Sequence, residues 1–204
     1  MKKFNLIALV LLAATALPVY ADGVATITKI AESSTAVKHI AIIHEGKESQ
    51  VTTDGEINLA DVVETTTNTA TLKMKKGEIW TLDEKTRFAI LEYPAPKAVY
   101  ELQEGSASYQ AGKKAPEAVI KVDSQEYLIS RDAVISISYD KTSTTLIVEA
   151  GSVVVGNETI KQGNIAKIDA TGKIEISKTQ AAPEKHKTRG IRGHHEDEDN
   201  KKMP

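Results

Sequence analysis

Short apolar or alternating runs fill residues 37–177, and glycine, aspartate and asparagine interrupt them. Ile135 and Ile137 alternate with serines, and Leu146 and Val148 form another set with a period of two. In a β-strand this period places one row of side chains on a core and the other in water. Because these residues show no convincing 3.6-residue apolar period, the pattern predicts an all-β domain of a dozen or more short strands.

Two runs are apolar at successive positions instead of alternating. Phe88–Leu91 and Val153–Val155 have this composition, which is typical of strands covered on both faces. These two segments are therefore expected to lie between layers.

Three glycines share the pattern apolar-x-x-Gly-x-apolar, namely Gly77, Gly105 and Gly151. Glycine adopts positive φ without steric cost, so each is expected to form a corner between two strands. Stacked corners build a rolled or β-solenoid-like fold, which is the expectation for this domain. A sandwich or an open barrel is the alternative.

Composition excludes several classes of protein. The 204 residues carry a formal charge of −2, without the cationic excess of a general nucleic-acid binder. There is no cysteine, which excludes disulfides, thiolate metal sites and cysteine nucleophiles. Apolar residues make up 41%, enough for a hydrophobic core. Burial and backbone pairing must therefore hold this domain together.

The N-terminal segment 1–21 has the three parts of a secretory signal peptide. Lys2 and Lys3 precede an apolar run from Leu6 to Val19, and a small-x-small sequence ends at Ala21. An apolar helix of about 14 residues rises only about 21 Å, less than the roughly 30 Å of a bilayer core. We expect cleavage after Ala21, export to a bacterial periplasm, and no membrane span in the mature protein.

The remaining boundaries follow from changes in composition. Residues 22–36 are interpreted as an N-terminal lead-in, 37–177 as the β domain, and 178–204 as a tail rich in Lys, His, Glu and Asp. Such a tail cannot bury enough apolar surface to offset chain entropy and is expected to be disordered. His186 and the segment His194–Asp199 resemble metal ligands in type, but no specific metal site is predicted there.

The search for reactive groups finds no catalytic motif of known spacing. His39 and His44 are interpreted as surface residues of one strand segment. Trp80, the sole tryptophan, is interpreted as a core aromatic, with sugar stacking as the alternative. We therefore predict no enzyme activity, no cofactor and no metal, and the binding residues are unknown.

Short apolar or alternating strands and glycine corners follow one another along the domain in a fixed order. They lie at Ile57–Thr65, Thr69–Met74, Trp80–Phe88, Val99–Ala107, Val119–Ser130, Leu146–Val155 and Ile160–Asn164. In order and spacing, these segments resemble the FecR-type periplasmic domain. Ala60 stands where that family usually has glycine, and the Gly-Thr pair of many members is missing around Ala133–Ile135.

The resemblance implies a rolled or helical β-structure and a non-enzymatic binding or scaffolding module of the bacterial envelope. Some members relay an outer-membrane transport signal to a sigma factor from behind a transmembrane helix. We expect neither a cytoplasmic segment nor a spanning helix here, so that relay is not carried over whole. The predicted partner is an unidentified envelope protein, in signalling or regulation. The alternative is a module that binds cell-wall glycan, and a polysaccharide-active enzyme is less favoured.

Overall fold

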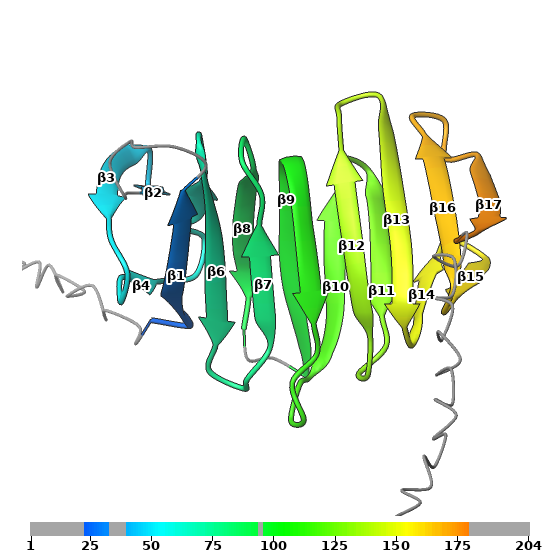
Figure 1. Ribbon diagram of the computed structural model, residues 1–204, viewed down its shortest axis with the longest axis horizontal. Coiled ribbons are helices and arrows are strands. Elements are labelled where there is room, and N and C mark those ends of the chain that lie inside the picture. The colour runs from blue at the N-terminus through cyan, green and yellow to red at the C-terminus, as the bar shows by residue number, and fades with distance from the viewer. Residues whose placement is uncertain (1–22, 33–39, 94–95, 180–204) are drawn as a thin grey trace, which may run out of the picture.

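A computed structural model describes residues 23–32, 40–93 and 96–179 of the chain. The elements in these ranges are strands, and backbone pairing links all seventeen of them in two layers that share β9 (Figure 1). We name the layers sheet A and sheet B. The prediction of an all-β domain with many short strands is confirmed.

Sheet A contains, in spatial order, β4 (Glu56–Ile57), β1 (Ala25–Glu32), β6 (Asn68–Met74), β7 (Ile79–Leu82), the C-terminal half of β9 (Lys97–Gln110), β12 (Val134–Tyr139), β13 (Ser143–Ala150), β16 (Asn164–Asp169) and β17 (Ile174–Lys178). Sheet B contains β3 (Lys47–Val51), β2 (Ile40–His44), β5 (Val62–Glu64), β8 (Arg87–Glu92), the N-terminal half of β9, β10 (Glu117–Val122), β11 (Gln125–Ile129), β14 (Ser152–Val155) and β15 (Glu158–Lys161).

Glycine turns the chain from one sheet to the other at two of the three expected corners. Gly105 has φ +93° in the middle of β9, and Gly151 has φ +71° between β13 and β14. Gly77 has φ +94° but lies in the turn between β6 and β7, within sheet A. All three glycines therefore have the positive φ that the sequence predicts. Gly105 and Gly151 also form crossings between the two layers, whereas Gly77 does not.

A hydroxyl group from a neighbouring segment holds each of these crossings. The N–H of Ser106 donates to Oγ1 of Thr86 at 3.1 Å, and the N–H of Ser152 donates to Oγ of Ser130 at 2.9 Å. A β-carbon at Gly105 would lie 2.5 Å from the Thr86 hydroxyl oxygen, and one at Gly151 would lie 2.5 Å from the Ser130 hydroxyl oxygen. The hydroxyl therefore fills the space that the absent side chain leaves.

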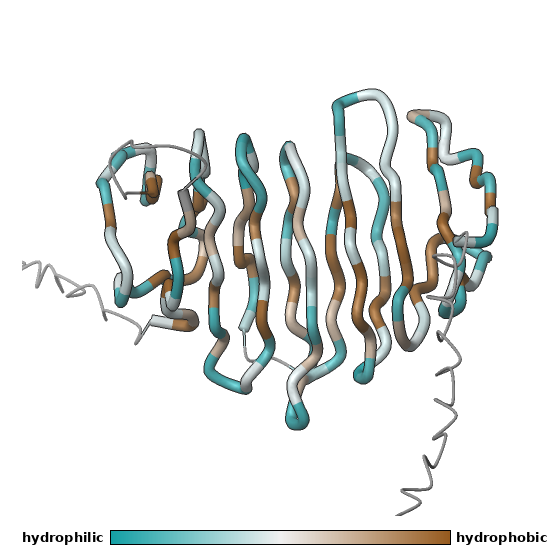
Figure 2. The backbone as a smooth tube through the Cα atoms, in the orientation of Figure 1, coloured by the Kyte–Doolittle hydropathy of each residue, from teal (hydrophilic) through white to brown (hydrophobic). Residues whose placement is uncertain are grey.

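The core lies between the two sheets. Figure 2 shows apolar residues concentrated along the strands and hydrophilic ones at many of the turns. Trp80 of sheet A contacts Phe88 and Tyr100 of sheet B, with ring centroids 4.8 and 4.9 Å apart. These rings and the aliphatic side chains around them are fully buried, and each contributes about 1.5–3 kcal/mol of hydrophobic stabilisation.

The structure does not show the rolled or solenoid-like form that the sequence predicts. The two layers remain open at both ends, and among the described strands every pair of neighbours is antiparallel except β9 with β10. A solenoid stacks successive coils in parallel, whereas here the chain turns back at hairpins and then crosses to the other layer. This arrangement agrees with the sandwich alternative.

Residues 22–36 were expected to lead into the β domain, and part of them belongs to it. Strand β1 pairs with β6 over seven residues and with β4 over two. Ile27 on this strand is fully buried. The predicted signal peptide 1–21 and the tail from residue 180 lie outside the described residues. No helix long and apolar enough to cross a bilayer occurs in residues 23–32, 40–93 and 96–179.

Candidate interaction surface

His44 forms a hydrogen-bonded pair that the sequence analysis missed. Its Nδ1 lies 2.5 Å from Oδ1 of Asp61, and the other carboxylate oxygen of Asp61 accepts the N–H of Asn58 at 2.8 Å. The Asp61 side chain is buried and the imidazole is more than half exposed. Asp61 thus holds the turn before β5, and no nucleophilic side chain is bonded to His44 among the described contacts. His39 lies outside the described residues.

The Trp80 environment excludes sugar stacking on its indole. Trp80, Tyr100 and Tyr109 are at most 1% exposed and pack against one another between the sheets. Their hydroxyl and indole N–H groups have no hydrogen-bond partner among the described residues. The interpretation of Trp80 as a core aromatic is confirmed, and the glycan alternative loses its proposed platform.

Glu78 carries a carboxyl group into this same core. It is fully buried just before β7, and its Oε2 accepts a hydrogen bond from the Tyr93 hydroxyl at 3.1 Å. Desolvation by burial raises the pKa of Glu78 above its ordinary value. Burial likewise raises the pKa of Tyr93, Tyr100 and Tyr109, so these hydroxyls stay protonated at physiological pH. Because it is enclosed by rings, this carboxyl group cannot reach a substrate in this arrangement.

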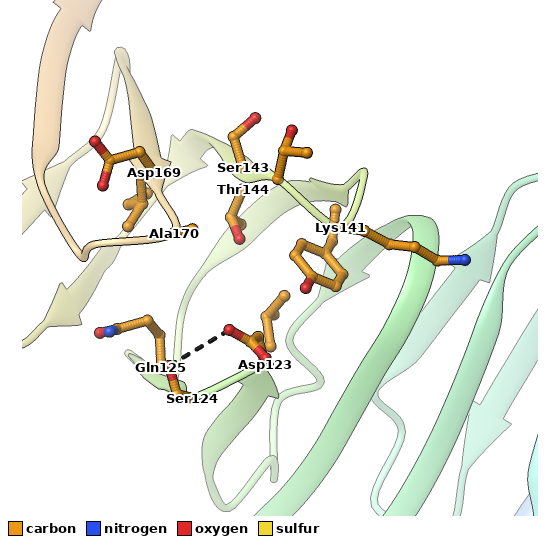
Figure 3. A pocket seen from close by; sticks show the side chains of 12 residues that line it. Asp123, Ser124, Gln125, Lys141, Ser143, Thr144, Asp169 and Ala170 are labelled. Carbon is orange, nitrogen blue, oxygen red and sulfur yellow. Dashed lines mark hydrogen bonds between the residues drawn. The ribbon is translucent and has the colours of Figure 1, made fainter.

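A small polar hollow lies where three hairpin turns meet, between β10 and β11, β12 and β13, and β16 and β17 (Figure 3). Its volume of about 20 Å³ holds little more than one water molecule. In the turn between β12 and β13, Asp140 accepts hydrogen bonds from Thr142 and Ser143, and these lower its pKa to about 2. Asp169 likewise accepts hydrogen bonds from Thr171 and Lys173. Both carboxylates therefore stabilise their own turns.

Metal-ligating side chains do not gather in the part of the chain that the structure describes. No group of three or more His, Asp or Glu residues there is placed to hold a metal ion. The histidine-rich tail segment His194–Asp199 lies outside these ranges.

The open end of the two layers presents a strand edge. Among the described strands β17 pairs only with β16, so its other backbone edge is free. Ile176 lies opposite Ala166, a fully buried residue, and so is on the core-facing side of the sheet. Yet its side chain is 46% exposed, because no strand follows β17 to cover it. Apolar surface and unpaired backbone groups thus coincide at this edge.

The opposite end of the molecule differs in character. Strand β3 also ends its layer, but its sequence Lys-Glu-Ser-Gln-Val is polar and its side chains are mostly exposed. Charged residues of this kind protect an edge from further pairing. Of these two edge strands, β17 is therefore better suited to pair with a further strand.

The fold and these surfaces define an all-β, two-layer domain whose described residues offer contact surface and hold no assembled catalytic group. No protein-family model matches the chain, and no curated protein matches it. Two crystal structures of a "putative anti-sigma factor" from Parabacteroides distasonis have a similar fold, with TM-scores of 0.50 and 0.51 at 12% sequence identity. Each match covers 57% of this chain and 59% of that chain, so the likeness spans less than two thirds of the solved protein. At this identity the likeness concerns the fold.

Proposed function

We propose that this chain is an exported, non-enzymatic, FecR-like module of the bacterial envelope that binds a partner protein in signalling or regulation. Two independent points support the proposal. Several segments of the sequence, taken in order along the chain, resemble the FecR-type domain. The fold resembles that of the Parabacteroides protein described above. Export follows from the predicted signal peptide 1–21, and sequencing of the N-terminus of the exported form tests cleavage after Ala21.

The free edge of β17 is the observation that carries the proposal. An extended segment of a partner can pair with the unpaired N–H and C=O groups of an edge strand. The exposed part of Ile176 then becomes covered, as it would be by a further strand of this sheet. Main-chain pairing supplies the affinity, and the side chains of β17 supply the specificity.

The residues of this strand indicate the chemistry of the partner segment. Lys173 Nζ and Glu175 Oε1 lie 2.7 Å apart on the outer side, and Ile174 and Ile176 lie on the inner side. A matching segment therefore alternates apolar residues toward the core with polar residues toward solvent. This alternation favours an extended protein segment over a glycan.

Crosslinking in intact cells, followed by mass spectrometry, tests the proposal. We compare the wild type with Ile176→Lys, which places a charge at the inner side of the edge, and with the control Gln50→Lys on β3. The wild type and the control should capture the same envelope protein, and Ile176→Lys should lose it at an unchanged melting temperature. Absence of a reproducible partner, or capture that Ile176→Lys leaves intact, would overturn the proposal.

A further inference from the structure

An apolar row crosses the outer face of sheet B. Val99 of β9 lies opposite Val119 of β10, Val119 opposite Leu128 of β11, and Leu128 opposite Val154 of β14. The neighbours of each in sequence, such as Ala98 and Ile129, are buried in the core, so the row itself faces away from the core. Four strands therefore present one aligned line of apolar side chains outside the sandwich.

The row is uncovered at one end. Val99 and Val119 are 7% and 3% exposed, but Leu128 is 39% exposed and is one of two large apolar side chains so exposed in the described part. A surface hollow of about 350 Å³ lies here, and Leu128, Val154, Lys97 and Glu126 help to line it. An exposed leucine beside a hollow is a candidate centre of an interface.

On β9 and β10, charged residues border the row on both sides, two positions away from it along the strand. On each of these two strands the two sides have opposite signs, and each side changes sign between β9 and β10. The first side consists of Lys97 and Glu117, and the second side consists of Glu101, Lys121 and, on β11, Glu126. On the first side of β11, the residue two positions from Leu128 is the uncharged Ser130. An apolar centre with a charged border is the usual anatomy of a protein interface.

This arrangement is complementary to itself. A two-fold axis along the apolar row places each strand against the same strand of a second copy, running in the opposite direction. Lys97 then faces Glu101 of the second copy, and Glu117 faces its Lys121. Leu128 lies beside its own counterpart at the axis. Such a two-fold contact is isologous, because each copy contributes the same patch.

We propose that the outer face of sheet B binds a second copy of this chain, face to face, to form a two-fold symmetric dimer. The four charges of β9 and β10 favour this occupant, since a surface of one sign, such as nucleic acid or anionic lipid, would meet both signs at once. The charges are available: the internal pairs Lys121–Glu126 and Arg131–Glu117 are long, at 3.6 and 3.7 Å, and solvent-exposed. The contact is separate from the β17 edge and does not depend on the proposed function.

The dimer is expected to be weak. Four strands span about 15 Å across, and five residues cover about 17 Å along each strand. This patch is smaller than that of a standard stable complex. The dissociation constant is therefore expected in the micromolar range or weaker, and self-association depends on protein concentration.

Sedimentation velocity of the processed protein over a concentration series tests the proposal. The wild type should shift from monomer to dimer, and Leu128→Lys should weaken dimerisation at least tenfold. The control Lys167→Glu makes a charge change on the outer face of sheet A and should leave dimerisation unchanged. Melting temperatures of all variants identify any that fail to fold.

A charge swap gives a second test that does not depend on Leu128. Glu117→Lys alone places two lysines face to face across the axis and should weaken the dimer. The double variant Glu117→Lys/Lys121→Glu restores opposite charges and should recover the wild-type dissociation constant within about threefold, or about 0.7 kcal/mol. A wild type that stays monomeric up to about 1 mM, a dimer that neither Leu128→Lys nor Glu117→Lys weakens, or a double variant without recovery would overturn the proposal.

Discussion

The hydroxyl of Tyr93 donates a 3.1 Å hydrogen bond to Oε2 of Glu78 and accepts a 2.6 Å hydrogen bond from the N–H of Lys76. This single group therefore connects the end of β8 to the turn between β6 and β7. Oε1 of Glu78 has no hydrogen-bond partner among the described residues. The buried carboxyl group is consequently easier to accommodate as a neutral acid than as an anion.

The pH dependence of stability should reveal this carboxyl group. Because burial raises the pKa of Glu78 in the folded state, the folded protein holds this proton more tightly than the unfolded chain. The stabilisation from this proton is complete at pH values below the ordinary pKa of glutamate. It is lost as the pH rises through the raised pKa of Glu78 in the folded protein. Between pH 5 and 8, the wild type should therefore lose unfolding free energy relative to Glu78→Gln, by at most about 1.4 kcal/mol per pH unit.

Urea unfolding at several pH values measures this difference. Glu175→Gln is the matched control, because Glu175 is exposed and the Lys173 ammonium beside it lowers its pKa, so it stays ionised over this range. The control should show the same pH slope as the wild type. Equal slopes for Glu78→Gln and the wild type would show that the carboxyl group of Glu78 is not shielded from water.

Gly105→Ala and Gly77→Ala separate steric crowding from backbone strain. Both glycines have nearly the same φ, +93° and +94°, so the strain of a side chain is similar, about 1–2 kcal/mol. A β-carbon at Gly105 would lie within 2.6 Å of the Lys85 carbonyl oxygen, whereas one at Gly77 meets nothing within 4 Å. Gly105→Ala should therefore lower the free energy of unfolding by at least about 1 kcal/mol more than Gly77→Ala. Equal losses in denaturant titration would contradict the crossing at Gly105.

Ala60→Gly should stabilise the protein. Ala60 has φ +64° in the turn before β5, a conformation that costs a residue with a β-carbon about 1–2 kcal/mol. Glycine removes this strain but gives the unfolded chain more freedom, which costs about 0.5–1 kcal/mol. The net gain is then up to about 1.5 kcal/mol, measured as a higher urea midpoint at an unchanged slope. The control Ala170→Gly changes a position without positive φ and should not stabilise the protein. A urea midpoint for Ala60→Gly below that of the wild type would refute the prediction.

Trp80→Phe should leave the surface of the protein unchanged, because the indole is fully buried. We expect the variant and the wild type to sediment to the same extent with purified cell wall. The variant should also melt at a lower temperature, since the smaller ring leaves a cavity in the core. Loss of wall binding at an unchanged melting temperature would instead place the indole in a glycan site.

Local patterns predicted much of the fold. The alternation at Ile135, Ile137, Leu146 and Val148 identified residues that are fully buried, and the glycine pattern identified the crossings at Gly105 and Gly151. Ala60, noted as standing where FecR-type domains usually have glycine, does adopt a left-handed conformation. Each of these inferences depends on interactions between residues close together in the sequence, so the local sequence is enough to predict it.

Other features depend on pairings between distant segments. The assignment of β1 to the sheet requires its pairing with β6, some 40 residues away, and the His44–Asp61 pair joins residues 17 positions apart. Thr86 and Ser130, which hold the crossings, resemble any surface hydroxyl residue in the sequence. The buried environment of Glu78 likewise has no local signal, because it results from rings on β7 and β9 together with Tyr93, which follows β8.

The sequence by itself determined that this protein is built of strands, where its chain turns sharply, and which side chains form the core, because these follow from side-chain period and backbone sterics. Only the tertiary structure decided that the strands form two open layers, that β17 is left with a free edge, and that Leu128 lies on a charge-bordered row. Strand neighbours are chosen by long-range pairing, and a one-dimensional pattern does not specify which edges that pairing leaves unused.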